Sequence, residues 1–286
     1  LRTKGAKRLS PFMLPKLISN LAPGYISIAI GSQGPNFSPV SACATGGHAV
    51  GEAYEMIRQG RCDVVVAGGA EATITPLGVS GFAAMRALST RNDAPTSASR
   101  PFDADRNGFV CAEGAGVLVM ESLESAQRRG AQIYAEVCGY GQSSDAHHIT
   151  LPRGDGAGAK LAMQNALRSA KLNPEQIDYV NAHGTSTPAG DIAESKALES
   201  VFGLRPDLWV SSTKSMLGHM LGAAGAVEAA ICALSIKNGC VPPTINLDTQ
   251  DPECRFDYVA HESRQRDIQY ALSNSFGFGG TNVSLI

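Results

Sequence analysis

The sequence has few aromatic residues and no excess of charge of either sign. Aromatic residues make up 6% of the 286 residues, with a single Trp, and 24 Lys and Arg nearly balance 26 Asp and Glu. A formal net charge of −2 gives no general attraction to nucleic acid or to an anionic membrane. We therefore predict neither as a partner, and any electrostatic docking must depend on a local patch.

Paired cysteines and long apolar runs are also missing. The 7 cysteines are scattered and never spaced Cys-x-x-Cys, which argues against a disulfide framework or a zinc ribbon and indicates a reducing compartment. No apolar run approaches the ~20 residues that cross a bilayer, so no membrane segment is expected. The chain starts at Leu1 rather than at a methionine, and we expect it to lack its true beginning.

Short apolar runs bounded by glycine are present, and they are typical of buried strands in an α/β protein. Residues 63–67 and 116–120 are predicted to be central strands covered on both faces. Residues 45–59 and 121–129 are predicted helices, each followed by a glycine. A further strand is predicted at residues 35–42.

A second series of elements repeats this order. It has a predicted strand from Ile133, a helix at 158–170 and a strand at 177–181. The similarity lies in the order of elements rather than in residues. It predicts two related α/β halves, residues 1–131 and 132–286.

Cys43 lies between the predicted strand at 35–42 and the predicted helix at 45–59, so its sulfur is expected at the N-terminal end of the helix. Unpaired N–H groups and the helix dipole favour thiolate there, so such a cysteine can ionise well below a free pKa of about 8.5. The alternative is a small buried cysteine that only packs.

Two histidines occupy comparable places. His183 follows the strand predicted at 177–181, and His219 precedes a helix predicted at 222–237. Ligands of α/β proteins bind at the carboxyl ends of strands. Each histidine alone is compatible with a hydrogen-bonded structural role, but two of them with Cys43 in equivalent positions indicate one site. No local His or Cys pair has metal-ligand spacing, so no metal is predicted.

The last segment, residues 271–286, is predicted to form a strand, a tight glycine turn and a strand. Its turn contains Phe276-Gly277-Phe278-Gly279-Gly280, where glycines can bring backbone N–H groups close to a reacting carbonyl. A plain hairpin turn is the alternative. The other glycine-rich stretches lack the spacing of phosphate or dinucleotide loops, so no nucleotide is predicted.

Several ordered motifs closely resemble the β-ketoacyl-[acyl-carrier-protein] synthases, the condensing enzymes of fatty acid synthesis. They are Ala42-Cys43-Ala44-Thr45-Gly46, residues 181–191 around His183, residues 214–219 from Lys214 to His219, residues 222–225, and residues 274–282. Residues 75–79 and 86–93 are most similar to the type II elongating branch, synthase II. Relative to the family pattern, the first half is expected to be incomplete.

This resemblance implies a thiolase-like α/β fold, with two duplicated halves in α-β-α-β-α layers, and a homodimer. It also implies that Cys43 accepts an acyl group from the phosphopantetheine of acyl carrier protein. Malonyl-acyl carrier protein then loses carbon dioxide and attacks the Cys43 thioester, lengthening the chain by two carbons. No enzyme-bound cofactor is implied, and the expected location is the bacterial cytoplasm, a plastid or a mitochondrion.

The resemblance also gives roles to individual residues. His183 and His219 would donate N–H bonds to the malonyl thioester oxygen, and the backbone N–H groups of Cys43 and Phe278 would bind the acyl oxyanion. Phe278 also resembles the family's gate to the acyl pocket. The remaining matches are Lys214 and Glu228 as charges that organise the second histidine, Phe276 as a further supporting residue, Thr185 and Thr187 for the pantetheine arm, and Lys7, Arg8 and Arg86 for carrier-protein docking.

Other members of the superfamily are alternatives. The three-carbon starter synthase has asparagine in place of one histidine, whereas this chain has both His183 and His219. A non-catalytic chain-length-factor-like subunit lacks the reactive cysteine, which is present here as Cys43. A thiolase and the ketosynthase module of a polyketide synthase remain open from the sequence alone.

Overall fold

The computed structural model describes residues 8–286, which form a short unit ending at Val40 and a large unit of Ser41–Ile286. The short unit carries helices α1 (Met13–Leu17) and α2 (Leu21–Ile30), and α2 ends at Gly31 in a left-handed conformation. The predicted strand at 35–42 is wrong. Residues 35–41 have no strand partner among the described residues, because Pro39 cannot donate its backbone nitrogen to a ladder.

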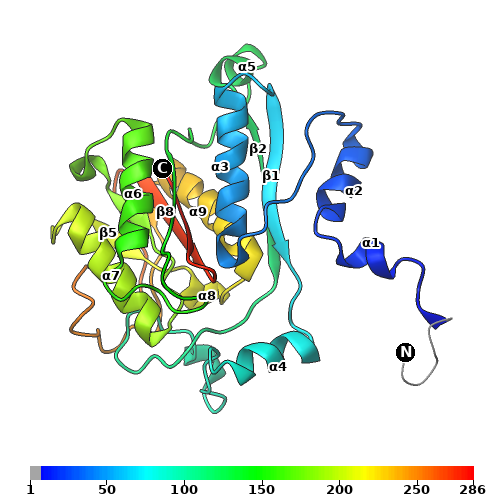
Figure 1. Ribbon diagram of the computed structural model, residues 1–286. Helices are drawn as coiled ribbons and strands as arrows, with labels where there is room; N and C mark the ends of the chain where they lie inside the picture. The colour runs from blue at the N-terminus through cyan, green and yellow to red at the C-terminus, as the bar shows by residue number, and fades with distance from the viewer. Residues whose placement is uncertain (1–7) are drawn as a thin grey trace. The chain divides into compact units, whose positions relative to one another are not determined.

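The large unit alternates helices and strands (Figure 1). In chain order its elements are η2 (Ala42–Ala44), α3 (Thr45–Arg58), β1 (Val64–Glu71), α4 (Pro76–Ala84), η3 (Pro95–Ser97), β2 (Gly114–Glu121), α5 (Leu123–Arg128), β3 (Tyr140–Ser144), α6 (Ala157–Ala170), η4 (Pro174–Gln176), β4 (Tyr179–Asn181), α7 (Pro188–Phe202), β5 (Trp209–Ser211), α8 (Lys214–Leu217), η5 (Leu221–Ala223), α9 (Ala224–Asn238), β6 (Cys240–Val241), β7 (Arg264–Gln265), β8 (Ala271–Gly277) and β9 (Thr281–Leu285).

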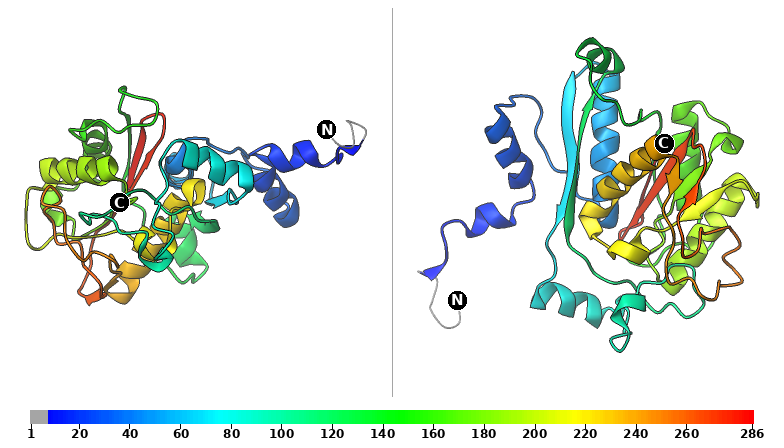
Figure 2. Two further views of the ribbon diagram at one scale, coloured as in Figure 1. Left: turned by 90° about the horizontal axis from the view of Figure 1, so that it is seen from below. Right: turned by 180° about the vertical axis from the view of Figure 1, so that it is seen from behind.

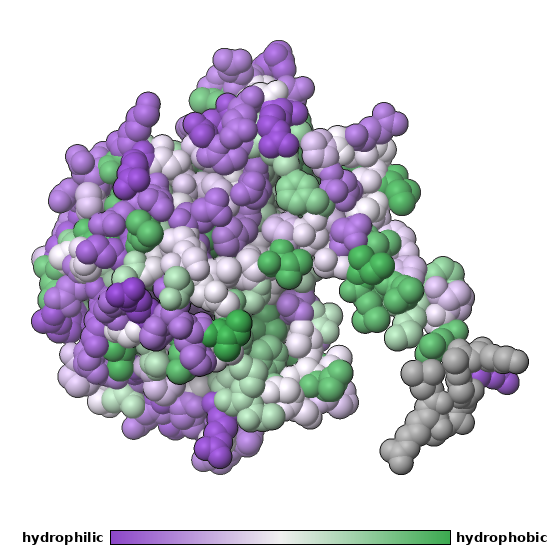
Figure 3. Space-filling model, in the orientation of Figure 1, coloured by the Kyte–Doolittle hydropathy of each residue, from purple (hydrophilic) through white to green (hydrophobic). Residues whose placement is uncertain are grey.

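The larger sheet has the strand order β3-β9-β8-β4-β5. Strand β4 is parallel to both β5 and β8, whereas β8 pairs with β9, and β9 with β3, in antiparallel fashion. All three residues of β4 are buried, as expected for a central strand with helices on both faces. Helix α6 contacts one face and α9 contacts the other. Hydrophilic side chains cover most of the outer surface around α6 and α7 (Figure 3).

Helices α3 and α9 form a layer between the larger sheet and the two-stranded β1–β2 sheet, which gives an α-β-α-β order across the large unit (Figures 1 and 2). The two helices touch through glycines. A Cβ atom at Gly46 would lie 2.6 Å from the Ala226 nitrogen, and one at Gly225 would lie 2.5 Å from the Gly47 nitrogen. Because Cβ atoms cannot approach backbone this closely, glycine permits the contact that brings the N-terminal ends of α3 and α9 together.

Strands β1 and β2 depart from the sequence prediction. They pair only with each other within the described residues, and Val64, Val117 and Val119 on one face are 51%, 56% and 67% exposed. The opposite face packs Leu118 and Met120 against the α3–α9 layer. The prediction of strands covered on both faces is therefore wrong for this part of the chain. A continuous run of Val and Ala residues does not reveal whether a strand is covered on one face or on both faces.

The other predicted elements are largely confirmed. The predicted helices correspond to α3, α5, α6 and α9, and the predicted hairpin at the C-terminal end corresponds to β8 and β9. The strand predicted from Ile133 is displaced, because β3 begins only at Tyr140. Its register follows from the antiparallel pairing of Tyr140 with Leu285 on β9.

One helical stretch, Leu221–Asn238, is long and apolar enough to cross a membrane by length and composition, contrary to the sequence analysis. It is 44% buried, and it carries the fully buried Glu228. The stretch contacts α3, β2 and β8, so it is a core helix of the large unit.

We predict that Gly46→Ala in the full-length protein lowers the free energy of unfolding by about 1–3 kcal/mol, because the new methyl group forces α3 away from α9. Urea unfolding with an unchanged m-value measures this. Gly81→Ala is the matched control, since nothing lies within 4 Å of a Cβ atom at that helical position. Its stability should be equal or higher by up to about 1 kcal/mol. Equal stability of Gly46→Ala and wild type would contradict the tight crossing.

Candidate active site

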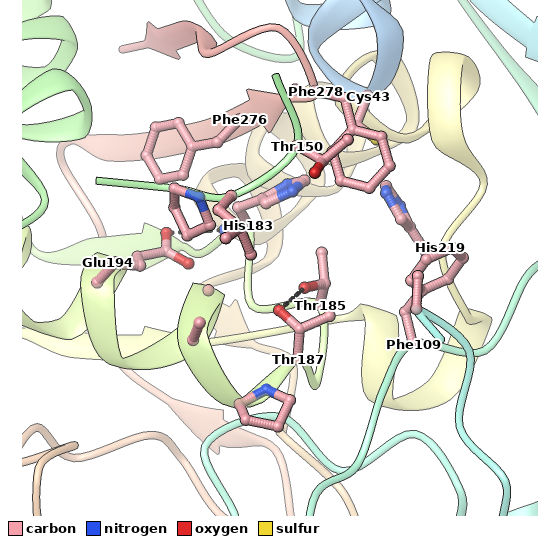
Figure 4. A pocket seen from close by; sticks show the side chains of 18 of the residues that line it. Cys43, Phe109, Thr150, His183, Thr185, Thr187, Glu194, His219, Phe276 and Phe278 are labelled. Atoms are coloured by element: carbon pink, nitrogen blue, oxygen red, sulfur yellow. Dashed lines mark hydrogen bonds between the residues drawn. The ribbon is translucent and has the colours of Figure 1, made fainter. Parts of the chain in front are cut away.

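A cavity of about 380 Å³ contains most of the predicted site residues (Figure 4). Cys43 comes from the turn before α3, His183 from the end of β4, and His219 from the loop between α8 and η5. The other predicted residues that line the cavity are Arg86, Thr185, Thr187, Phe276 and Phe278. The structure thus brings together residues separated by up to 235 positions in the sequence, counting from Cys43 to Phe278.

Cys43 lies in a single 3₁₀ turn that leads directly into α3. Its side chain is nearly inaccessible, with 8% exposure, and it packs with Phe109 and Leu221. The preceding Ala42 has a φ of 49°, a left-handed conformation that costs a non-glycine residue roughly 1 kcal/mol. Cys43 thus lies at the start of a helix, as its sequence context predicts.

The expected direction of the Cys43 pKa is wrong. Burial raises the pKa of the Cys43 thiol to about 11, because thiolate loses its hydration in this site. The charge of Lys214 and the backbone N–H groups of Phe278 and Cys43 act in the opposite direction but do not compensate for burial. The resting form at neutral pH is therefore the thiol, with two backbone donors directed at its sulfur.

The two imidazoles lie against each other with ring centroids 5.4 Å apart and an interplanar angle of 85°. Burial lowers the pKa of both His183 and His219 well below the ordinary value, and the positive charge of Lys214 lowers each further. Both rings are therefore neutral at pH 7, and each has one N–H group to donate. Figure 4 shows both rings pointing toward Phe278 and Cys43.

Lys214 and Glu228 form a buried ion pair, with each side chain 2% exposed. Burial raises the pKa of Glu228 to about 7, and the adjacent Lys214 opposes this shift. The Lys214 charge acts on Cys43 and on both histidines. The charge of Lys214 therefore acts on the reacting groups, although neither member of the pair lines the cavity.

Glu194 is a site residue that the sequence analysis missed. Its two carboxylate oxygens accept hydrogen bonds from the backbone nitrogens of His183 at 2.9 Å and Gly184 at 2.7 Å. Asn274 donates to the same carboxylate at 3.2 Å. Glu194 therefore fixes the backbone that carries His183. The available sequence signal was an acidic residue in the helix that follows the His183 loop, and the structure shows that α7 brings it back to the His183 backbone.

The loop after His183 is clamped from outside the cavity. Thr185 and Thr187 hydrogen-bond to each other at 3.0 Å, and the intervening Ser186 has a φ of 71°. Arg106 donates to the backbone oxygen of Thr187 at 3.2 Å, and Asp191 accepts from the Ser186 nitrogen at 3.2 Å. These contacts direct two hydroxyl groups at the cavity.

The predicted docking residues are only partly described. Arg86 lines the cavity, and Arg8 is exposed. Lys7 lies outside the described residues. Within residues 8–286, no group of three or more His, Cys, Asp and Glu side chains could hold a metal ion, and all 7 cysteines are unpaired.

Comparison with known proteins gives consistent results. Residues 1–126 match the family model "Beta-ketoacyl synthase, N-terminal domain", and residues 134–248 match "Beta-ketoacyl synthase, C-terminal domain". The chain belongs to the β-ketoacyl synthase family. The 3-oxoacyl-[acyl-carrier-protein] synthase 2 of Staphylococcus aureus (strain COL) is 53% identical over 287 residues, covering 100% of this chain and 69% of the relative. The synthase 2 of Synechocystis is 52% identical, covering 99% and 68%.

Solved structures agree with this β-ketoacyl synthase assignment and with the thiolase-like α/β fold. A β-ketoacyl synthase from Burkholderia phymatum STM815 is 42% identical with a TM-score of 0.94, covering 99% of this chain and 69% of the other. A type II polyketide ketosynthase in complex with its acyl-carrier protein is 36% identical with a TM-score of 0.95, covering 98% and 69%.

The raised pKa of Cys43 predicts how this β-ketoacyl synthase reacts with an alkylating agent. Iodoacetamide labelling of Cys43 in the full-length protein should rise about tenfold per pH unit between about pH 6.5 and about pH 9.5, because thiolate is the nucleophile. Mass spectrometry of the Cys43 peptide measures this rate, with N-acetylcysteine as the reference thiol. A plateau below about pH 8 would mean a stabilised thiolate and would contradict the burial argument.

Proposed function

We propose that this chain catalyses the decarboxylative Claisen condensation of an acyl thioester with malonyl-acyl carrier protein, lengthening a fatty acyl chain by two carbons. The observation that carries the proposal is the convergence of Cys43, His183 and His219 in one cavity, with the Cys43 and His219 side chains buried. Each group alone is common in proteins. A buried thiol facing two neutral imidazoles and two backbone N–H donors is suited to acyl transfer followed by enolate chemistry.

In the first step, the Cys43 sulfur attacks the acyl thioester on the phosphopantetheine of acyl carrier protein. A sulfur–carbon bond forms to Cys43, the bond to the pantetheine sulfur breaks, and the thiol proton ends on the departing pantetheine thiol. The backbone N–H groups of Cys43 and Phe278 bind the oxygen of the tetrahedral intermediate, where negative charge develops. Phe278 serves as the gate to the acyl pocket.

In the second step, malonyl-acyl carrier protein binds and loses carbon dioxide. The electron pair of the broken carbon–carbon bond passes into the thioester as an enolate, whose oxygen accepts hydrogen bonds from His183 and His219. The enolate carbon then attacks the Cys43 thioester, a carbon–carbon bond forms, and the carbon–sulfur bond breaks. Cys43 leaves as a thiolate and takes up a proton from solvent to restore the resting thiol. Because decarboxylation generates the carbanion, no strong base is needed, and neutral imidazoles are sufficient as donors.

Acyl carrier protein is the proposed partner. One structural relative is a ketosynthase in complex with its acyl-carrier protein. Thr185 and Thr187 would hold the pantetheine arm, and the basic side chains of Lys7, Arg8 and Arg86 would contact the acidic carrier protein. Lys214, Glu228 and Phe276 support the histidines, and no resident cofactor is required. We expect a homodimer in the cytoplasm of a bacterium, or in a plastid or mitochondrion.

We also propose that residues 1–131 and 132–286 are duplicated halves. Ala42 and Leu221 have φ angles of 49° and 46°, and each begins a 3₁₀ turn that leads into α3 or α9. A shared rare conformation at two corresponding positions supports a common origin.

A polyketide ketosynthase is the second candidate, because structural relatives include ketosynthases of polyketide synthases. Identity of 53% to the fatty acid enzyme, against 36% to that ketosynthase, favours fatty acid synthesis. A chain-length-factor role is disfavoured by Cys43. A fatty acid enzyme should accept a fully reduced acyl chain as substrate, whereas a polyketide ketosynthase should accept a polyketone chain. The substrate accepted therefore distinguishes the two enzymes.

We predict that replacing Cys43 and replacing His183 in the full-length protein impair different steps of the reaction. Cys43→Ala should form neither acyl-enzyme nor 3-ketoacyl product. His183→Ala should still acylate Cys43 but condense about 10²- to 10³-fold more slowly, because one enolate donor is lost. Acyl-enzyme, 3-ketoacyl-carrier protein and carbon dioxide are followed by mass spectrometry.

His147→Ala is the control, because this exposed histidine does not line the cavity. Its condensation rate should equal that of wild type. Unchanged product from Cys43→Ala would remove the proposed nucleophile. Loss of acylation by His183→Ala, or an unchanged condensation rate, would contradict the role of that histidine.

A further inference from the structure

Ser41 stands where the turn that carries Cys43 meets the hairpin that carries Phe278. Its backbone oxygen accepts from the Ala44 nitrogen at 3.0 Å, which closes the 3₁₀ turn around Cys43. The same oxygen accepts from the Thr281 hydroxyl at 3.1 Å. A single carbonyl group therefore links the two segments that supply the backbone donors to the Cys43 sulfur.

Hydrogen bonds of the β8–β9 hairpin hold Thr281 in place. Thr281 pairs with Gly277 at the end of the β8–β9 ladder, and the turn between them is closed by a 3.1 Å bond from the Gly280 nitrogen to the Gly277 oxygen. A Cβ atom at Gly277 would lie 2.6 Å from the Ser41 oxygen. The hairpin backbone is thus in direct contact with Ser41, and a shift of Thr281 would displace Phe278.

Two side chains of helix α3, Thr45 and His48, also hydrogen-bond to Ser41. The Ser41 nitrogen donates to the Thr45 hydroxyl at 2.9 Å, and the Ser41 hydroxyl hydrogen-bonds to Nδ1 of His48 at 2.8 Å. The same Nδ1 lies 3.2 Å from the Ala44 oxygen. These bonds fix Ser41 next to Ala42, whose left-handed conformation persists only if its neighbours are held.

We propose that Thr281 and His48 are positioning residues that hold Ser41 from opposite sides and thereby set the separation of the two backbone donors of the oxyanion hole. The inference rests on the proposed function, because the Cys43 and Phe278 donors matter only if an acyl oxyanion forms there. Neither side chain lines the cavity, so neither touches the substrate.

The test compares two reactions of Cys43 in the full-length protein. Acyl transfer from acyl-carrier protein develops an oxyanion, whereas alkylation by iodoacetamide does not. Thr281→Val keeps a β-branched side chain on β9 and removes only the hydroxyl. It should acylate about 10- to 100-fold more slowly, with KM for acyl-carrier protein changed less than about twofold, because misplaced donors affect the transition state. Its alkylation rate should stay within about twofold of wild type.

Conservative variants provide the matched comparison. Thr281→Ser retains the hydroxyl and should recover acylation to within about threefold of wild type. His48→Leu should show the same selective loss as Thr281→Val, and His48→Asn should recover part of it, because the Asn amide can occupy the place of Nδ1. Thr249→Val, at an exposed position outside the cavity, should behave as wild type.

The outcomes separate this inference from the proposed function. If wild type forms no acyl-enzyme, the proposed function is wrong. If wild type acylates and Thr281→Val acylates equally fast, the positioning role is wrong. Equal losses of acylation and alkylation in Thr281→Val would also overturn it, because they would mean that the Cys43 turn itself had collapsed.

Discussion

Burial of the Cys43, His183 and His219 side chains is the constraint on which the rest of the site depends. The same burial raises the pKa of the Cys43 thiol and lowers the pKa of both imidazoles, so every reacting group is neutral before substrate arrives. Neutral groups can be buried without an unpaired charge, and hydrogen bonds made in such a place are stronger than in water. Buried charged side chains nearby have partners: Lys214 pairs with Glu228, and Glu194 accepts from the backbone nitrogens of His183 and Gly184.

The layered fold explains how this site is built at the ends of several elements. Helices α3 and α9 cross at Gly46 and Gly225, and this contact places the Cys43 turn beside η5. The larger sheet then supplies His183 from the end of β4 and Phe278 from the β8–β9 turn. Each reactive group comes from an element end whose position is fixed by packing elsewhere. Rigid elements can therefore orient the groups.

The sequence predicted which residues meet in the cavity better than it predicted their environment. Local motifs pointed to Cys43 and both histidines, which stand next to predicted strand and helix ends. The direction of the Cys43 pKa could not be read locally, because the residues that bury the sulfur, Phe109 and Leu221, are distant in sequence. The helix-end argument was sound in itself, but desolvation is the larger effect. Likewise, the exposed face of β1 and β2 depends on tertiary packing, which composition does not encode.

The central claim is that two neutral imidazoles act on one oxygen in a buried cavity. A double-mutant cycle with His183→Ala, His219→Ala and the double variant, measuring release of carbon dioxide from malonyl-carrier protein by acylated full-length protein, tests it most directly. If both donors serve one enolate oxygen, the double variant should be slower than either single variant by no more than about tenfold. The contrary result is a rate of carbon dioxide release in the double variant that is reduced by the product of the two single-variant factors. It would mean that the histidines act independently and would contradict the account.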